Sequence, residues 1–387
     1  MNNLILGYKR GRNKWETILR ALWNIDQDVD VVIKDFDKIE GPYDRIITVA
    51  ESLLPIQAEL EKRWGINNLS AESAAILSDK KSMDDFCISA GLGNLIPDSV
   101  IPKCPSDLDI FKDRPFIIKP TIGSGTKQYR PFDYVTYNNK RDFLLSVDNS
   151  FFEDNIKGYE HTVFNSRTSY YMAQEQLPDE AELYAPYYYG TKNILWVKSK
   201  ITVKKIDEYS HETRAVSWMS VPTESVPLDV REEAQRFMDT VTSKLKLKNM
   251  FFSGPDYYKW GSNIKLIDAN PRLGQGLQII DSLHDYGIIP KILLGEPYVI
   301  NKHFLWGISN LKPGKIKSVR DISHLKKYLA RTNWELKPDM IIPEFQHIQM
   351  TENRCRTAFY IEGANESDML ETYRTVNAEV QASIEYY

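Results

Sequence analysis

The sequence has few of the residues that bind metals through sulfur or form disulfides. Its 387 residues include only three cysteines, and Cys87, Cys104 and Cys355 lie far apart. An odd number at wide spacing argues against a disulfide framework and against the C-x-x-C spacing of metal sites. The six histidines are scattered, without metal-site spacing and without a Ser/His/Asp or Cys/His group. We therefore expect a reducing, cytoplasmic setting and a reaction that needs no protein nucleophile.

Neither an excess of charge nor a long apolar run is present. Lys and Arg number 49 against 53 Asp and Glu, a net charge of −4, so the totals show neither a nucleic-acid footprint nor an acidic tail. The N-terminal apolar run is very short, which fits neither a signal peptide nor a membrane span. We expect a soluble protein with a small-molecule or peptide substrate, and no nucleic-acid or membrane partner.

Two familiar nucleotide motifs are also missing. No Gly-x-Gly-x-x-Gly follows the first strand, and the glycines near residue 124 lack P-loop spacing. Instead, a short apolar strand ends in Lys119 and is followed by Gly123, Ser124, Gly125 and Thr126. Such small residues let backbone N–H groups approach phosphate oxygens, and a lysine adds positive charge. A loop of this kind alone is more often a plain turn. The phosphate-binding interpretation is supported by the lysine before the loop and by the acidic hairpin later in the chain.

Residues 252–272 alternate in polarity around a Gly/Ser/Asn cluster, which predicts a β-hairpin. A loop of three or five residues centred on Ser262 would place Asp256 directly opposite Asp268. Like charges with Cβ atoms ~5 Å apart destabilise a hairpin unless something neutralises them. Asn270 returns to the same face, and two carboxylates with an amide oxygen suit Mg²⁺. We therefore predict a metal-phosphate site; the alternative is an exposed hairpin with solvated acids.

Residues 1–95 resemble an open α/β unit. Short apolar segments typical of buried strands alternate there with helical patterns, at Leu4–Gly7, Val29–Ile33 and Arg45–Val49. Ligands of such sheets bind beyond the carboxyl ends of the strands. This places Glu51 and a basic loop with Arg10 and Arg12 at a candidate substrate crevice, and the two arginines favour an anionic partner. A solvated basic surface is an equal alternative.

The rest of the chain supplies further elements in order. We expect a helix that runs to Gly91 with Ser78 or Asp79 as its N-cap. Further along the chain we expect strands over Tyr170–Leu177 and within Leu183–Met219, a helix over Val230–Leu247 and a helix through Ile280 toward Gly287. The last part has strand-like Gly307–Leu311, helix-like Ile322–Leu329, strand-like Arg356–Glu362 and a closing helix to about Ala378. If the strand ending at Leu177 carries an adenine, Leu177 must supply the backbone donor, since Pro178 has no N–H. Glu182 is placed to accept from ribose hydroxyls, although a strand with an acidic turn is the plainer interpretation.

Taken together, the order of these parts resembles the ATP-grasp superfamily. The motifs are Lys80 in S-D-K-K-S-M, I-I-K-P-T-I-G-S-G-T around Lys119, Q-E-Q-L with a later Glu182, Asp256, and L-I-D-A-N-P-R. The likeness covers roughly residues 70–300. It implies an α/β (α+β ATP-grasp) fold: an open α/β pre-ATP-grasp domain over 1–95, a small or lid subdomain over 96–182, a large subdomain with the metal hairpin over 183–300, and a C-terminal α+β covering module over 301–387.

The resemblance also implies roles for single residues. Lys80 and Lys119 would contact ATP phosphates beneath the loop of Gly123, Ser124, Gly125 and Thr126, Glu175 and the Leu177 backbone would meet adenine, and Glu182 would meet ribose. Asp256, Asp268 and Asn270 would hold Mg²⁺ or Mn²⁺, and Arg272, with Arg214 as a second candidate, would contact the transferring phosphoryl group or acyl phosphate. The superfamily usually has Glu where this chain has Asp268, and the shorter side chain disfavours bridging of two metals.

The implied reaction is that of a carboxylate-amine ligase. A substrate carboxylate attacks the γ-phosphate of ATP, and an amine then displaces phosphate from the acyl phosphate, so that an amide or peptide bond, ADP and phosphate result. Two alternatives remain: a carbamoyl-phosphate-synthase-like, carboxylating or kinase-type enzyme of the same superfamily, and a nucleotide-binding regulator without catalysis. The resemblance further implies pairing as a homodimer. The sequence names neither the carboxylate nor the amine.

Overall fold

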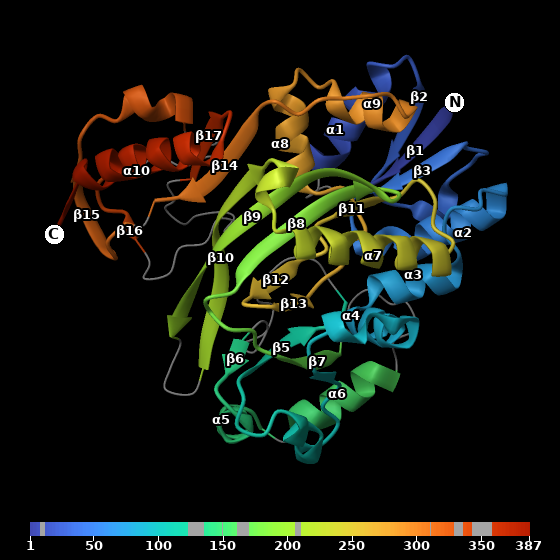
Figure 1. Ribbon diagram of the computed structural model, residues 1–387, viewed down its shortest axis with the longest axis horizontal. Helices are drawn as coiled ribbons and strands as arrows, with labels where there is room; N and C mark the ends of the chain where they lie inside the picture. The colour runs from blue at the N-terminus through green and yellow to red at the C-terminus, as the bar shows by residue number, and fades with distance from the viewer. Residues whose placement is uncertain are drawn as a thin grey trace.

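The computed structural model describes residues 1–7, 12–122, 135–148, 150–160, 170–205, 210–309, 311–328, 336–342 and 358–387. These ranges form an N-terminal α/β unit, a small subdomain, a broad central sheet and a C-terminal module at the opposite side of the molecule (Figure 1). The predicted mixture of helices and sheets is confirmed. Where the chain divides into domains remains our prediction.

A three-stranded parallel sheet forms the core of the N-terminal unit. Its order is β2 (Asp28–Val32), β1 (Asn2–Leu6), β3 (Arg45–Thr48), and the flanking helices are α1 (Arg12–Trp23) and α2 (Leu54–Trp64). The apolar residues of β1 are completely buried, because both faces of a central parallel strand are covered. All the strands predicted in this unit are therefore present.

Two short helices, α3 (Ala71–Ser78) and α4 (Lys80–Cys87), lead into the small subdomain. The Asp79 side chain caps α4 by accepting a backbone N–H at 2.7 Å, so one of the two caps we predicted is confirmed. This cap places Lys80 in the first turn of α4. The α-helical part ends before Gly91, because a π-helical turn follows in which Gly91 has a φ of 87°.

The small subdomain contains a sheet covered by two helices. Its elements are β4 (Ser99–Val100), β5 (Phe116–Pro120), β6 (Val135–Tyr137), α5 (Lys140–Ser146), α6 (Ser150–Glu160) and β7 (Tyr171–Glu175). Aromatic rings fill the space between them: Phe116 lies 5.8 Å from Phe143, which lies 5.2 Å from Phe151, by ring centroids. Strand β6 pairs with β10, so this sheet continues into the central one.

The central sheet is antiparallel and combines three long strands with three short ones. They are β8 (Glu182–Tyr189), β9 (Lys192–Lys205), β10 (Ser210–Val221), β11 (Phe251–Ser253), β12 (Tyr257–Trp260) and β13 (Asn263–Leu266). Helix α7 (Leu228–Lys244) lies across one face (Figure 1), with Phe237 and Val241 completely buried. On the other side α8 (Gln275–Leu283) and α9 (Ile288–Leu294) share an apolar core with α1. The predicted strands and both predicted helices are thus confirmed.

The C-terminal module extends the central sheet. Its elements are β14 (His303–Ile308), β15 (Gly314–Val319), η8 (Ser323–Tyr328), β16 (Ile341–Ile342), β17 (Ala358–Gly363), α10 (Glu366–Ala382) and β18 (Ile384–Tyr386). The strand predicted at Gly307–Leu311 was placed too late. It begins at His303, because β14 pairs with both β10 and β17, and it ends before a turn in which the Leu311 N–H donates to Ser309. Predicted helix 322–329 is a 3₁₀-helix.

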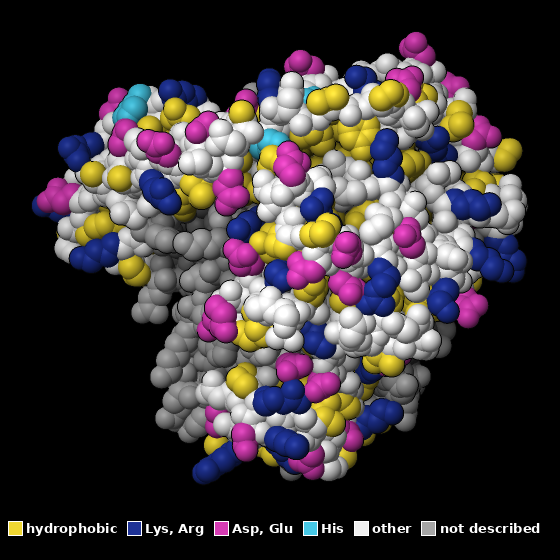
Figure 2. Space-filling view, viewed as in Figure 1, with side chains coloured by type: hydrophobic (Ala, Val, Ile, Leu, Met, Phe, Trp, Pro, Cys, Tyr) yellow, Lys and Arg dark blue, Asp and Glu magenta, His cyan; other side chains and the backbone are white. Residues whose placement is uncertain are grey.

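Surface charge is mixed in sign on the face shown in Figure 2, where basic and acidic side chains alternate over all parts. Within the described ranges, no helix is long and apolar enough to cross a membrane. The mixed surface charge agrees with the even charge totals of the sequence.

Candidate active site

The hairpin β12–β13 carries the acids that we predicted to hold a metal. Its turn consists of two residues, Gly261 and Ser262, and Gly261 has a positive φ of 53°, as turns of this length require. The predicted loop of three or five residues was therefore wrong. With Tyr257 paired to Leu266, a regular ladder would place Ile267, not Asp268, opposite Asp256.

A bulge restores the opposition of the two acids. The Ile267 N–H donates to the Asp256 carbonyl at 2.9 Å, and the Asp256 N–H donates to the Asp268 carbonyl at 2.8 Å. Ile267 and Asp268 thus both face Asp256, which is the pattern of a β-bulge. Because the bulge inserts one extra residue, it compensates for the shorter turn, and Asp256 still faces Asp268.

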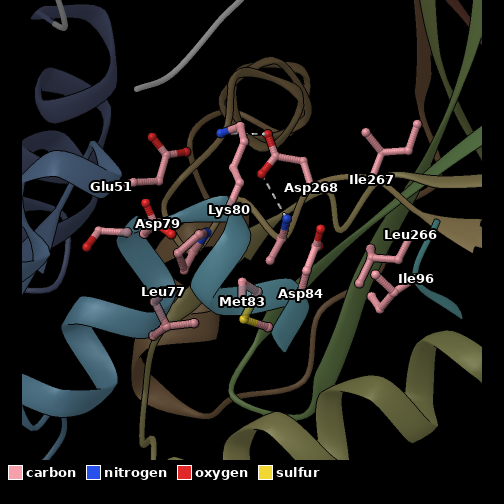
Figure 3. A pocket seen from close by; sticks show the side chains of 13 residues that line it. Glu51, Leu77, Asp79, Lys80, Met83, Asp84, Ile96, Leu266, Ile267 and Asp268 are labelled. Atoms are coloured by element: carbon pink, nitrogen blue, oxygen red, sulfur yellow. Dashed lines mark hydrogen bonds and ion pairs between the residues drawn. The ribbon is translucent and has the colours of Figure 1, made fainter. Parts of the chain in front are cut away.

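Asp268 borders a cavity between α4 and the hairpin (Figure 3). Its polar lining comes from three segments far apart in sequence: Glu51 of the N-terminal unit, the α3–α4 segment with Ser78, Asp79, Lys80 and Asp84, and Asp268. Apolar side chains, including Leu77, Met83, Ile96 and Leu266, complete the lining. The cavity combines an apolar wall with charges of both signs, as a nucleotide site needs.

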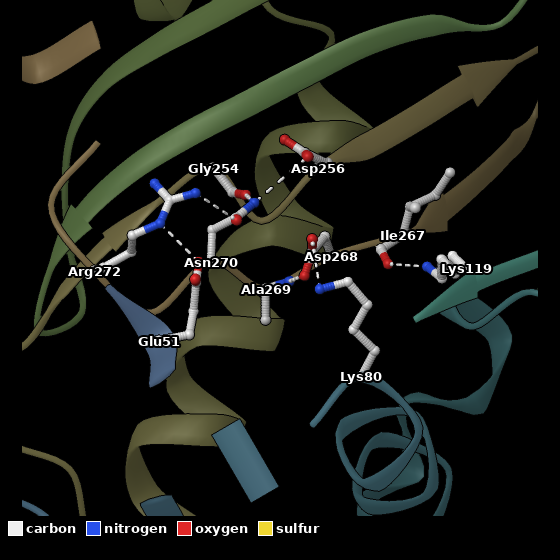
Figure 4. A network of polar contacts seen from close by, with 10 residues as sticks. All are labelled: Glu51, Lys80, Lys119, Gly254, Asp256, Ile267, Asp268, Ala269, Asn270 and Arg272. Atoms are coloured by element: carbon white, nitrogen blue, oxygen red, sulfur yellow. Dashed lines mark hydrogen bonds and ion pairs between the residues drawn. The ribbon is translucent and has the colours of Figure 1, made fainter. Parts of the chain in front are cut away.

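Lys80 and the two acids form a charge cluster (Figure 4). Burial, and then the charge of Asp268, raise the pKa of Asp256 to about 8. Burial would also raise the pKa of Asp268, but the ammonium groups of Lys80 and Lys119 outweigh it and lower that pKa. Lys80 Nζ lies 3.3 Å from Asp268 Oδ2. Of these two coupled acids, Asp256 therefore keeps its proton to higher pH than Asp268 does.

Lys119 lies at the end of β5 and is 3% exposed. Its Nζ donates to the Ile267 carbonyl at 3.1 Å, next to the acids (Figure 4). Burial lowers the pKa of Lys119 to about 8, against the opposing effects of Asp268 and Asp84. The structure thus brings together both lysines that we predicted to contact phosphates.

Asn270 and Arg272 follow the acids. Asn270 Nδ2 donates to the Gly254 carbonyl at 2.7 Å, and Asn270 Oδ1 accepts from Arg272 Nη2 at 3.0 Å. The amide oxygen that we predicted as a metal ligand therefore already accepts one hydrogen bond and keeps a second lone pair. Arg272 Nε donates to Glu51 Oε1 at 2.7 Å, and Nη1 donates to Ser253 at 2.9 Å. The substrate crevice predicted at Glu51 is thus joined to the hairpin.

The residues present fit a hard divalent cation with few protein ligands. Asp256 and Asp268 are opposed carboxylates that need positive charge, and the Asn270 amide lies beside them. Among the residues whose structure is described, no group of three or more His, Cys, Asp or Glu could hold a metal. Mg²⁺ bound here would therefore take most of its remaining ligands from phosphate and water, as it prefers.

The predicted adenine edge is only partly available. Glu175 Oε1 accepts from Arg114 Nη1 at 2.8 Å, and Arg114 also binds Asp98, so the Glu175 carboxylate already has a cationic partner. Leu177 lies just beyond β7, where its backbone carbonyl accepts from the Gln176 side chain. Glu182, at the start of β8, accepts from Tyr184 at 2.7 Å and forms an ion pair with Lys198.

The remaining predicted site residues are those of the glycine loop, Arg10, Arg12 and Arg214. Gly123, Ser124, Gly125, Thr126 and Arg10 fall outside the described residues. Arg12 begins α1, and Arg214 lies in β10 opposite Thr202.

Sequence reasoning missed Asp84 and Ser253. Asp84 is buried on α4, accepts from Ser99 at 2.8 Å, and has a pKa raised by burial to about 6. It lies four residues after Lys80, and that helical spacing is a signal that could have found it. Ser253 carries no such signal, because only the folded chain brings it to Arg272.

Comparisons with known proteins give matches at the level of structure. No protein-family profile and no curated protein gives a significant match to the sequence. The solved structure of an L-amino acid ligase from Bacillus licheniformis is similar with a TM-score of 0.63 at 12% identity, covering 100% of this chain and 99% of that one. Phosphoribosylglycinamide synthetase from Anaerococcus prevotii gives 0.57 at 14% identity, with 100% and 99% covered.

A third structure is carboxyaminoimidazole ribonucleotide synthase from Aspergillus clavatus, complexed with ATP. It is similar with a TM-score of 0.60 at 11% identity, and the alignment covers 99% of each chain. Identity this low establishes the fold alone. The match nevertheless spans the whole chain, including the N-terminal unit and the C-terminal module. The chain has the ATP-grasp fold, as the order of its motifs predicted.

Proposed function

We propose that this chain is an ATP-dependent carboxylate-amine ligase that forms an amide or peptide bond through an acyl phosphate and releases ADP and phosphate. The observation that carries the proposal is the cluster of Lys80, Lys119, Asp256, Asp268 and Arg272 around one site. In a ligase of this kind the protein supplies charge and orientation, not a nucleophile. Those are the features that this cluster offers.

ATP is proposed to bind with its phosphates between α4, β5 and the hairpin. In the structure Lys80 pairs with Asp268, and Lys119 donates to the Ile267 carbonyl. When ATP binds, phosphate oxygens would replace Asp268 and the Ile267 carbonyl as partners of the two lysines. Mg²⁺ held by Asp256, Asp268 and Asn270 would supply the positive charge that phosphoryl transfer needs. The Leu177 backbone and Glu182 are proposed to meet adenine and ribose, while Glu175 acts through Arg114.

The reaction then proceeds in two displacements. A carboxylate oxygen attacks the γ-phosphorus, the bond to the bridging oxygen of ADP breaks, and an acyl phosphate forms. The amine nitrogen attacks the carbonyl carbon, the carbon–oxygen bond to phosphate breaks, and the proton that the amine loses passes to the departing phosphate. Arg272 is held by Glu51, Ser253 and Asn270, so its guanidinium is already oriented toward charge that develops on the transferring group.

A carboxylating enzyme of the same fold is the second candidate. It is favoured by the likeness to carboxyaminoimidazole ribonucleotide synthase, whereas the likeness to an L-amino acid ligase favours amide formation. For a carboxylating enzyme, bicarbonate alone would support ADP formation.

The test is a substrate screen with purified protein, ATP and Mg²⁺. All pairs of the proteinogenic amino acids are supplied, and orthophosphate and ADP are measured. We expect at least one pair to give equal amounts of both, with the amide product visible by mass spectrometry. Release of AMP and pyrophosphate would overturn the proposal, and ADP formation with bicarbonate and no amine would favour the second candidate. Tight ATP binding without turnover would indicate a regulator instead.

A further inference from the structure

Glu51 belongs to the N-terminal unit but lies at the proposed reaction site. It begins the 3₁₀-turn η3 (Glu51–Leu53) just after β3, at the carboxyl end of the parallel sheet. Its residue surface is only 9% exposed. One oxygen, Oε1, accepts from Arg272 Nε at 2.7 Å (Figure 4). Glu51 therefore holds the arginine that we assign to the acyl phosphate.

The other oxygen, Glu51 Oε2, has no hydrogen-bond partner among the residues that the structure describes, although it is buried. A buried carboxylate oxygen without a donor is costly, and such atoms often mark a place where a ligand binds. Glu51 also lines the cavity beside Lys80 and Asp268 (Figure 3). Glu51 Oε2 is thus an available acceptor at the cavity, while the other oxygen of the same carboxylate binds Arg272.

The neighbouring charges indicate which ligand group fits this acceptor. Lys80 is paired with Asp268, and all three nitrogens of Arg272 donate to protein acceptors. A second carboxylate or a phosphate placed against Glu51 would meet like charge, whereas an N–H group would complete its hydrogen bonding. A protonated amine would add an attractive charge.

We propose that Glu51 binds the amine substrate through Oε2 while Oε1 holds Arg272. This inference rests on the proposed ligase function, since only that reaction uses an amine. Because one carboxylate contacts both groups, the amine nitrogen is held beside the carbonyl carbon of the acyl phosphate. Glu51 thereby selects for an amine and orients it for attack.

Glu51→Gln separates the two roles. The glutamine Oε1 can still accept from Arg272 Nε, and its NH₂ group replaces the cavity-facing acceptor by a donor. The assay uses the most active amino-acid pair of the screen. We expect the KM for the amine partner to rise about tenfold or more, as for loss of a charged hydrogen bond. Hydroxylamine at high concentration traps the acyl phosphate without needing the amine site, and hydroxamate formation should stay within about twofold of wild type.

The matched control is Glu59→Gln on α2, an acid of the same unit whose side chain is 71% exposed and bound to Arg63. It should leave both readouts unchanged. An amine KM within about twofold of wild type in Glu51→Gln would overturn the proposal, and so would a parallel loss of hydroxamate, since Glu51 would then act only through Arg272. If melting shows that Glu51→Gln does not fold, Glu51→Asp is assayed instead. It withdraws both oxygens by one methylene, so the amine KM alone is the readout: a rise of about tenfold supports the proposal, and a value within about twofold of wild type overturns it. A wild-type chain that releases no phosphate in the whole screen overturns the ligase function, and the amine site falls with it.

Discussion

Lys80 Nζ lies 3.3 Å from Asp268 Oδ2, so the carboxylate that we assign to a metal already faces a cation. Their side chains are 13% and 29% exposed, which makes this a largely buried pair. Under this assignment, binding of a metal nucleotide would exchange partners: Lys80 would move its charge to a phosphate, and Asp268 would receive the metal. Removing either member of such a pair leaves the other uncompensated.

Asp268→Asn removes one charge at nearly constant shape. We expect Mg²⁺-dependent phosphate release to fall about 100-fold or more, with the fold retained. Phosphate release and thermal melting are the measurements. Asp339→Asn is the matched control, because it breaks an exposed ion pair with Lys315 far from the hairpin. Full activity of Asp268→Asn would refute the metal assignment.

Lys119→Ala should mainly weaken the use of ATP. The side chain is buried and donates to the Ile267 carbonyl, so its ammonium group is held in place beside the acids. We expect the KM for ATP to rise about tenfold or more, and titration calorimetry should show weaker binding of ATP. Lys140→Ala, which loses a surface pair with Asp109, should change neither value. Equal ATP affinity in both variants would contradict the phosphate role.

Metal binding without nucleotide should depend on pH. The pKa of Asp256 is raised to about 8, and a metal must displace the proton that this acid holds at lower pH. Affinity for Mn²⁺, followed by paramagnetic resonance, should therefore be constant above pH 8 and fall by up to about tenfold per unit below it. Asp256→Asn should bind Mn²⁺ weakly at every pH. A flat profile in the wild type would show that Asp256 is not a ligand.

Gly274 is required by packing at the start of α8. A Cβ added there would lie 2.4 Å from Ser253 Cβ and 2.8 Å from Tyr187 Cε1. Gly274→Ala must displace Ser253, which binds Arg272, so we expect a loss of about 1–3 kcal/mol of stability together with lower activity. Denaturant melts and phosphate release measure both. Gly93→Ala is the control, since its nearest neighbour would lie at 3.8 Å; equal effects of the two changes would exclude the packing explanation.

Glu61 should make the N-terminal unit less stable as pH rises. Burial raises its pKa to about 7 from 4.5, against hydrogen bonds from Gln57, Leu69 and Asn68. Between pH 4.5 and pH 7 the folded chain binds more protons than the unfolded chain. The contribution of protonated Glu61 to the free energy of unfolding is therefore fully present below pH 4.5 and is lost as pH rises through 7.

Glu61→Gln carries no such proton. Relative to wild type, its free energy of unfolding should increase on the order of 3 kcal/mol between pH 4.5 and pH 8. Urea melts at both pH values measure this difference. Glu59→Gln, an exposed neighbour, should show no pH-dependent difference. If Glu61→Gln differs from wild type by the same free energy of unfolding at both pH values, the raised pKa of Glu61 is contradicted.

Local patterns predicted much of the fold. The apolar runs of β1 to β3, the Asp79 cap and the two arms of the hairpin each depend on a few adjacent residues. The register that pairs the two acids does not depend on adjacent residues alone. The same alternation of polar and apolar residues is compatible with a three-residue loop and with a two-residue turn followed by a bulge. The face-to-face arrangement of Asp256 and Asp268 was confirmed, although the loop length from which we argued it was wrong.

The features that could not be predicted from the sequence depend on contacts between distant segments. Glu51 and Arg272 are 221 residues apart, and no pattern in either segment indicates the other. Arg114 pairs with Glu175 across 61 residues, which takes up a carboxylate that resemblance assigned to adenine. β14 was placed late because its limits depend on β10 and β17, its partners in the sheet.

The pairing of β14 has one more consequence. Its backbone is hydrogen-bonded to β10 on one side and to β17 on the other, and Trp306 packs against Trp218 of β10 at 5.3 Å between ring centroids. The C-terminal module therefore cannot melt without exposing part of β10, so its unfolding is thermodynamically coupled to that of the central sheet. A chain truncated before β14 would present β10 as a bare strand edge, which is a template for aggregation.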